Sequence, residues 1–234
     1  MPANVESSSI AYAVYNSGDV TINIPSGTVQ GDLLLCYFLT FTEAGYGTPT
    51  HEPPAGWTKV IERTSDIYFS GAVIGAIYYK IATNSEPSTY VWGNSLSTRT
   101  FGNVVMLRIS GVDTSNPIHT SASTNTISPA SNYIFPSVTL SSPNKLLAIF
   151  GGLANTPTAG QWPLAVPTDF TRHSYISDSG NGIHFGSASK MQTTSGVTGT
   201  FTVPFNDFEN LAQGFTVAIN SMPIKSYSYS YIIG

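Results

Sequence analysis

The sequence repeats itself: residues 20–111 and residues 137–221 follow the same order of apolar positions and turns. Such an internal repeat predicts two structural units with equivalent cores. No cluster of acids, histidines or cysteines repeats with it, so the duplication describes a scaffold and not a duplicated catalytic site. The matched positions are Ile22 and Ile24 with Val138 and Leu140, Leu33–Cys36 with Leu146–Ile149, Trp57 with Phe170, Lys80–Thr83 with Lys190–Thr193, and Val105, Leu107 and Ile109 with Phe215, Val217 and Ile219.

Charged side chains are scarce. They make up 9% of the residues, against about 25% in ordinary domains, while 41% of the residues are hydrophobic. This composition predicts a folded protein with a neutral, hydroxyl-rich surface, as is common in secreted β-proteins and virion proteins. Because the net charge is −4 and the nine Lys and Arg residues are spread singly, we expect no nucleic-acid binding.

The chain has one cysteine, Cys36, which excludes an intrachain disulfide. It lies in an apolar run, and we interpret it as a small buried side chain. The lack of disulfides is consistent with assembly in a host cytoplasm and a role outside it. The polar opening Met1–Glu6 predicts no secretion signal, and no apolar run has the length of a membrane span, so we expect no membrane insertion.

Strand patterns dominate the chain. Val20, Ile22 and Ile24 alternate with polar residues, which is typical of a half-buried strand. Residues 33–41 are apolar nearly throughout, which predicts a central strand buried on both faces. We expect strands at residues 9–15, 20–24, 33–41, 71–82, 89–92, 103–110, 138–140, 145–150, 170–176, 184–193, 199–203 and 215–220.

About a dozen strands in two equivalent halves predict an all-β fold, a jelly-roll-like β-sandwich with the halves related by a pseudo-two-fold axis. We expect residues 1–221 to form it, with 112–136 as a surface crossover and 222–234 as a C-terminal arm. One continuous sandwich is the favoured arrangement, and two separate lobes are the alternative. The apolar side chains that should anchor the crossover are Ile118, Ile127, Tyr133, Ile134 and Phe135.

Four segments together resemble a family of β-sandwich modules found in phage virion proteins and large bacterial surface proteins. They are Gly31–Leu35, Pro54–Thr58, Tyr78–Pro87 and Leu107–Ile118. The resemblance covers roughly residues 5–221 and implies a structural or adhesive role without catalytic residues. This chain differs from the surface-protein members because it is a single module with a tyrosine-rich tail, and both differences favour a small virion component.

The residues themselves indicate no catalytic, metal or cofactor site. His51, His119, His173 and His184 are widely spaced, without a second ligand at a metal-binding spacing. Asp113 resembles a calcium loop only loosely, and we interpret it with Asn116 as a turn cap. No pair of acids is marked as a glycosidase pair, and no nucleophile elbow or phosphate-binding loop is present in the sequence.

Two regions are candidates for binding a partner. The loops 40–56 and 151–169 are the longest, occupy equivalent places in the repeat, and carry rings that could stack on a sugar or enter a protein partner. The arm alternates Tyr and Ser after Pro223, which is the periodicity of a strand with one aromatic face. The candidate residues are Tyr46, His51, Gln161 and Trp162 in the loops and Tyr227, Tyr229, Tyr231 and Ile233 in the arm.

The sequence therefore favours a non-enzymatic phage virion protein, a decoration or cement protein on the exterior of the capsid. Its expected partners are the major capsid protein or another virion protein, and further copies of itself as a dimer or trimer. The alternative is an adhesion module, from a tail fibre or a cell surface, that binds a glycan through Tyr46 and Trp162.

Overall fold

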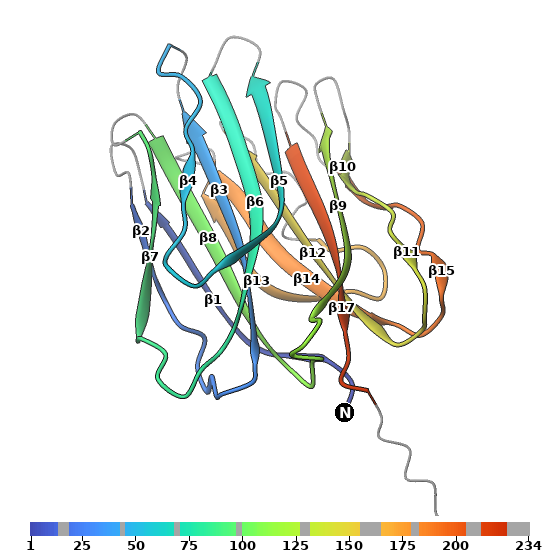
Figure 1. Cartoon of the computed structure of the whole chain (residues 1–234). Coiled ribbons are helices and arrows are strands. Elements are labelled where there is room, and N and C mark those ends of the chain that lie inside the picture. Colours follow the sequence, from blue (N-terminus) through green and yellow to red (C-terminus); the bar gives the residue numbers. More distant parts are fainter. Residues whose placement is uncertain are drawn as a thin grey trace, which may run out of the picture.

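The computed structural model of the 234-residue chain is all-β (Figure 1). It describes residues 1–13, 19–42, 45–67, 71–96, 100–126, 132–154, 165–178, 183–204 and 212–223. Every regular element within these ranges is a β-strand. In the same part of the chain, there is no helix with the length and apolarity that a membrane crossing requires.

Two antiparallel five-stranded sheets form the body of the molecule. The first has the order β1-β8-β3-β6-β5 and the second the order β9-β17-β12-β14-β13. The first sheet contains β1 (Asn4–Ala13), β8 (Thr100–Ser110), β3 (Leu33–Thr42), β6 (Gly71–Ile81) and β5 (Thr58–Ile67). The second contains β9 (Ile118–Thr126), β17 (Ala212–Asn220), β12 (Lys145–Ala154), β14 (Ile183–Gln192) and β13 (Thr171–Asp178).

The strand registers place the repeated residues at equivalent points of the two sheets. Leu34 pairs with Lys80 and Arg108, and Leu147 pairs in the same way with Lys190 and Ala218. This is the correspondence that the repeated sequence predicts. The edge strands β1 and β9 also correspond, although they lie outside the two repeated segments.

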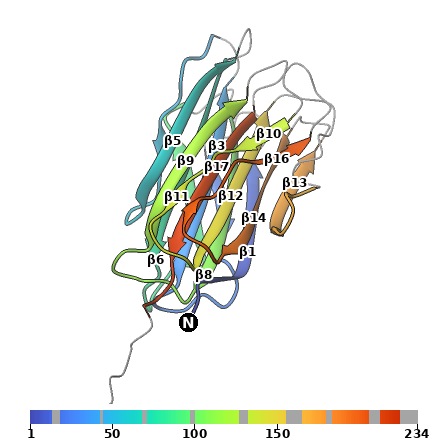
Figure 2. The ribbon, with the colours of Figure 1, turned by 90° about the vertical axis from the view of Figure 1, so that its right-hand side faces the viewer.

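The two sheets pack face to face and share one core (Figure 2). Side chains of β3 and β8, such as Tyr37 and Val105, meet side chains of β12 and β17, such as Phe150 and Phe215. The Tyr37 ring centroid lies 5.9 Å from that of Phe150 and 5.2 Å from that of Phe215. Because both halves fill this core, they form one β-sandwich and not two separate lobes.

Shorter strands cover the outer face of each large sheet. The first sheet is covered by a three-stranded layer of β2 (Val20–Asn23), β7 (Thr89–Asn94) and β4 (His51–Glu52). The second sheet is covered by two strand pairs. These are β10 (Asn132–Phe135) with β16 (Phe201–Pro204), and β11 (Thr139–Leu140) with β15 (Gly196–Val197). The odd-numbered residues of β3 therefore face the central core and the even-numbered ones face the outer layer. This confirms the prediction of a central strand buried on both faces.

The connection between the repeated segments is more regular than the expected crossover. It contains β9 and β10, and β9 closes one edge of the second sheet. Tyr133 and Phe135 are fully buried, and Ile118 packs against the central core, so these three anchors are confirmed. Ile127 lies outside the described residues. Strand β5 begins directly after Trp57, the residue that the repeat matches with Phe170 at the start of an expected strand.

Candidate functional site

His51 is held inside the fold by contacts of both ring nitrogens. Nε2 lies 3.0 Å from the Thr40 hydroxyl and Nδ1 lies 3.3 Å from the Tyr78 hydroxyl. The ring is also packed 4.2 Å from the Phe38 ring, measured between centroids. Burial lowers the pKa of His51 to about 3, with a further contribution from the positive charge of Lys59. His51 is therefore a neutral residue that fastens β4 to the first sheet.

Of the other candidate binding residues, Tyr46 alone lies within the described residues. Tyr46 lies in the loop before β4, and 43% of its surface is exposed. Gln161 and Trp162 lie outside the described residues, as do Tyr227, Tyr229, Tyr231 and Ile233 of the arm. Trp57 and Phe170, which the repeat assigns to the core, are buried as expected.

The Asp113 turn has the hydrogen bonds of a cap. Asp113 Oδ1 accepts hydrogen bonds from the Ser115 backbone N–H at 3.0 Å and from the Ser115 hydroxyl at 2.6 Å. These two bonds lower the pKa of the Asp113 carboxyl. The interpretation as a turn is thus confirmed. Within the described ranges, no group of three or more His, Cys, Asp or Glu side chains could hold a metal ion.

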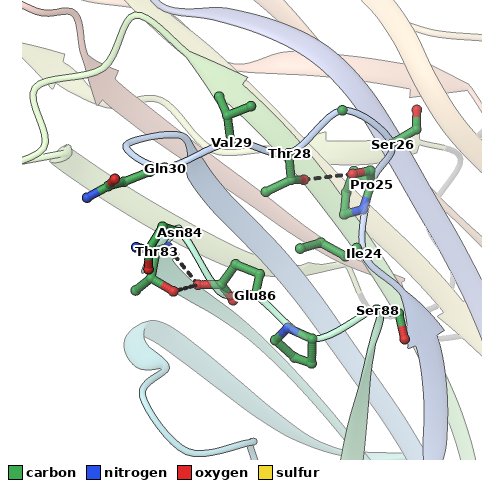
Figure 3. A pocket seen from close by; sticks show the side chains of 12 residues that line it. Ile24, Pro25, Ser26, Thr28, Val29, Gln30, Thr83, Asn84, Glu86 and Ser88 are labelled. Atoms are coloured by element: carbon green, nitrogen blue, oxygen red, sulfur yellow. Dashed lines mark hydrogen bonds between the residues drawn. The ribbon is translucent and has the colours of Figure 1, made fainter.

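An open pocket of about 570 Å³ lies between the loop that follows β2 and the turn between β6 and β7 (Figure 3). Its lining combines hydroxyl and amide side chains with the apolar surface of Ile24, Val29 and two prolines, and it has one carboxylate, Glu86. The pocket lies on elements of the first half only.

Glu86 is fully engaged at the wall of this pocket. It accepts hydrogen bonds from the Thr83 backbone N–H at 2.7 Å and from the Thr83 hydroxyl at 2.9 Å (Figure 3). Lys80 Nζ lies 2.8 Å from the same carboxylate, and the Tyr90 hydroxyl donates to it as well. Burial opposes ionisation, but the bonds from Lys80, Tyr90 and Thr83 outweigh it and lower the pKa of Glu86 to about 2. Glu86 therefore fixes the turn and is not poised as a general acid.

The opposite wall is held by an ion pair. Arg108 Nε lies 2.6 Å from Asp32 Oδ2, which also accepts the Val29 backbone N–H at 3.0 Å. Arg108 Nη1 donates to the Ser26 carbonyl at 3.4 Å. These bonds fix the loop of residues 25–32 before any ligand binds. The sequence contains the Gly31-Asp32 turn, but no local pattern pairs Asp32 with Arg108, because 75 residues separate them.

Comparison of the chain with models of protein families, with curated proteins and with solved structures found no match.

Proposed function

We propose that this chain is a non-enzymatic structural protein of a bacteriophage virion, a decoration or cement protein that binds the capsid exterior. The support comes from a surface suited to strand addition. The outer strands of the two large sheets are β1, β5, β9 and β13. The edge of a sheet is usually blunted with charges or proline, or covered by a neighbouring segment, because an open edge recruits another chain.

Strand β9 lacks charges and proline, although β5 and β10 lie close to it and its residues 118–125 are half-buried. It reads Ile118-His-Thr-Ser-Ala-Ser-Thr-Asn-Thr126, with no Lys, Arg, Asp, Glu or Pro. Its one irregularity in pairing with β17 lies at the beginning, beside Ile118, so residues 120–126 keep a regular register. By contrast, β5 carries Lys59, Glu62 and Arg63. The single observation that carries the proposal is this uncharged edge.

The arm of a neighbouring copy is the proposed occupant. Residues 224–234 alternate Tyr and Ser, so that an added strand would turn Tyr227, Tyr229 and Tyr231 to one face. Backbone hydrogen bonds along β9 would give affinity and the tyrosines would give register. Copies linked in this way would bridge capsid subunits and stabilise the shell by mass action.

Purified, expanded phage capsids that lack their decoration protein test this proposal. The chain should sediment with them in saturable amounts, and removal of residues 224–234 should reduce the bound amount at least tenfold. Failure of the full chain to sediment with any such capsid would contradict the capsid role.

Carbohydrate adhesion is the second candidate. It is favoured by the exposed ring of Tyr46, in the loop that follows β3, while the open pocket before β3 is a separate surface at the other end of that strand. A glycan array probed with the full chain separates the two functions. Strong binding to one neutral glycan class, lost with Tyr46→Ala, would favour adhesion.

A further inference from the structure

The pocket shown in Figure 3 is an addition to the repeated scaffold. Its walls are the loop between β2 and β3, residues 24–32, and the turn between β6 and β7, residues 82–88. The corresponding connections of the second half are shorter, with residues 141–144 between β11 and β12 and residues 193–195 between β14 and β15. Both walls are therefore lengthened at the same place in one half, which a scaffold role alone does not require.

The two walls are joined to each other without any ligand. The Ile24 N–H donates to the Ser88 carbonyl at 2.9 Å, and the Gly31 N–H donates to the Ala82 carbonyl at 2.9 Å. Between these two bonds, the Ile24 side chain projects into the space between the walls (Figure 3). A ligand would therefore meet a surface that is already formed, so that little entropy is lost on ordering the loops.

The lining suits a side chain with an apolar body and a polar tip. Ile24, Pro25 and Pro87 offer apolar surface, and the hydroxyl and amide side chains around them can bond a polar group. The one carboxylate in the lining, that of Glu86, is already paired with Lys80. A neutral ligand is therefore favoured, and the tyrosine side chain has this combination of an apolar ring and a hydroxyl group.

The chain carries tyrosines close to the pocket. The arm begins at Met222, whose N–H donates to the Gly111 carbonyl at 2.8 Å. Gly111 follows Arg108 by three residues, and Arg108 Nη1 donates to the Ser26 carbonyl in the pocket wall at 3.4 Å. The start of the arm and the pocket therefore lie at the same end of the sandwich, about 10 Å apart along the chain that follows Arg108 (Figure 1).

The arm is long enough to reach the pocket of its own chain. An extended chain spans about 3.3–3.6 Å per residue, so Tyr227 can lie about 16 Å from Met222, and Tyr231 about 30 Å from it. A short tether gives an effective concentration on the order of millimolar. At micromolar protein, the arm therefore meets its own pocket far more often than the pocket of another copy.

We propose that the pocket binds the tyrosines of the chain's own arm, with one ring packed against Ile24 and the two prolines. The inference rests on the proposed function in one respect, because the arm that docks here is the arm offered to β9 of a neighbouring copy. Docking holds the arm back in the free chain. The high local concentration of copies on a shell then shifts the arm from its own pocket to the neighbour by mass action.

Photo-cross-linking of the full chain tests this contact. p-Benzoylphenylalanine in place of Tyr229 keeps an aromatic ring in the arm and, on illumination, bonds to a nearby C–H group. Mass spectrometry locates the new bond, and a mixture of unlabelled and isotope-labelled chains shows whether it joins one chain or two. We expect bonds within one chain, to residues 24–30 or 83–88.

Two proline substitutions give a matched comparison. Pro87→Asp places a charge in the lining and should lower the yield of these bonds about tenfold. Pro143→Asp makes the same change at an exposed proline of the second half, between β11 and β12, and should leave the yield unchanged. In sedimentation velocity, Pro87→Asp should self-associate more strongly than the natural chain, because its arm is released to β9 of a neighbour, and Pro143→Asp should not.

The outcomes distinguish the docked arm from the proposed capsid role. Bonds to β9 of another chain, with none to the pocket, would overturn docking while supporting strand addition. Bonds to the pocket of another chain, bonds scattered over the surface, or an unchanged yield in Pro87→Asp would also overturn it, as would weaker self-association of that variant. Bonds within one chain to the pocket, together with a failure to sediment with capsids, would support docking and contradict the capsid role.

Discussion

Leu39 fills the space that a side chain at position 152 would need. A Cβ on Gly152 would collide with a methyl group of Leu39 and would lie 2.8 Å from the Tyr37 hydroxyl. The two residues hold equivalent places, since Leu39 pairs with Gly75 and Asn103, and Gly152 pairs with Phe185 and Gln213. The duplicated halves have thus diverged where they meet, with a large residue on one sheet opposite a glycine on the other.

This relationship predicts an energetic coupling between the two positions. Gly152→Ala should destabilise the fold by about 1–3 kcal/mol, because it overpacks the core, and Leu39→Ala should cost about 2–5 kcal/mol, because it leaves a cavity. The double variant should be more stable than the sum of the two losses indicates, since the shorter residue 39 makes room for the new methyl group. Denaturant unfolding of the four proteins measures this coupling, and strict additivity would contradict the contact.

Gln213 joins the two sheets through a buried side chain. Its Nε2 donates to the Arg63 carbonyl at 3.1 Å and also lies 3.3 Å from the Ser65 hydroxyl. Gln213→Leu should cost about 1–3 kcal/mol of unfolding free energy, because a buried acceptor loses its donor. Gln30→Leu, on the exposed loop, is the control and should change stability by less than about 0.5 kcal/mol. Equal effects of the two substitutions would argue against the bridge.

The Glu86 network predicts a stability that depends on pH. The pKa of Glu86 in the folded chain is lowered to about 2 from an ordinary value of 4.5. Its ionised form therefore stabilises the fold above pH 4.5, and this contribution is lost as the pH falls toward 2. The difference in unfolding free energy between the natural chain and Glu86→Gln should be largest at neutral pH and shrink across this range.

Glu62→Gln is the matched control for that series. Its partner Lys59 is exposed and three residues away, and pairs of this kind contribute little. The control should show a small difference with a weak pH dependence. A Glu86→Gln curve parallel to that of the natural chain would contradict the assigned role of Glu86.

The arm should drive self-association without contributing to the fold. Replacing Tyr227, Tyr229 and Tyr231 by serine should shift the chain toward monomer in analytical ultracentrifugation, while the melting temperature stays the same. Alanine at Ser226, Ser228 and Ser230 changes the opposite face and should leave the association intact. Loss of folding in the tyrosine variant would assign the arm to the core and refute the proposed contact.

Chelation should leave thermal stability unchanged. Ser115 already occupies Asp113 Oδ1 with two hydrogen bonds, so this turn is complete without a cation. Calorimetry with and without a chelator measures the effect. A clear drop in the melting temperature would reopen the calcium interpretation of the turn.

The sequence predicts a strand well where the strand's own residue pattern shows which of its faces are buried. Residues 33–41 are apolar on both faces, and only a strand covered on both sides satisfies such a pattern. The match between Trp57 and Phe170 in the repeat predicts that both are in the core, and the Asp113 turn follows from its own side-chain chemistry. These features are local, so the sequence pattern contains them.

Other features depend on partners that are distant in the chain. The bounds of β5 do not follow from its sequence pattern, because its charged, alternating residues lie at a sheet edge. Strand β9 is not predicted, because its Ser and Thr residues resemble a linker. The sequence alone aligned Lys80 with Lys190, but it could not reveal that Glu86 neutralises only the first of them. Ion pairs, cation–aromatic contacts and the fit of Leu39 against Gly152 arise when separate strands are brought together, so only the tertiary structure decides them.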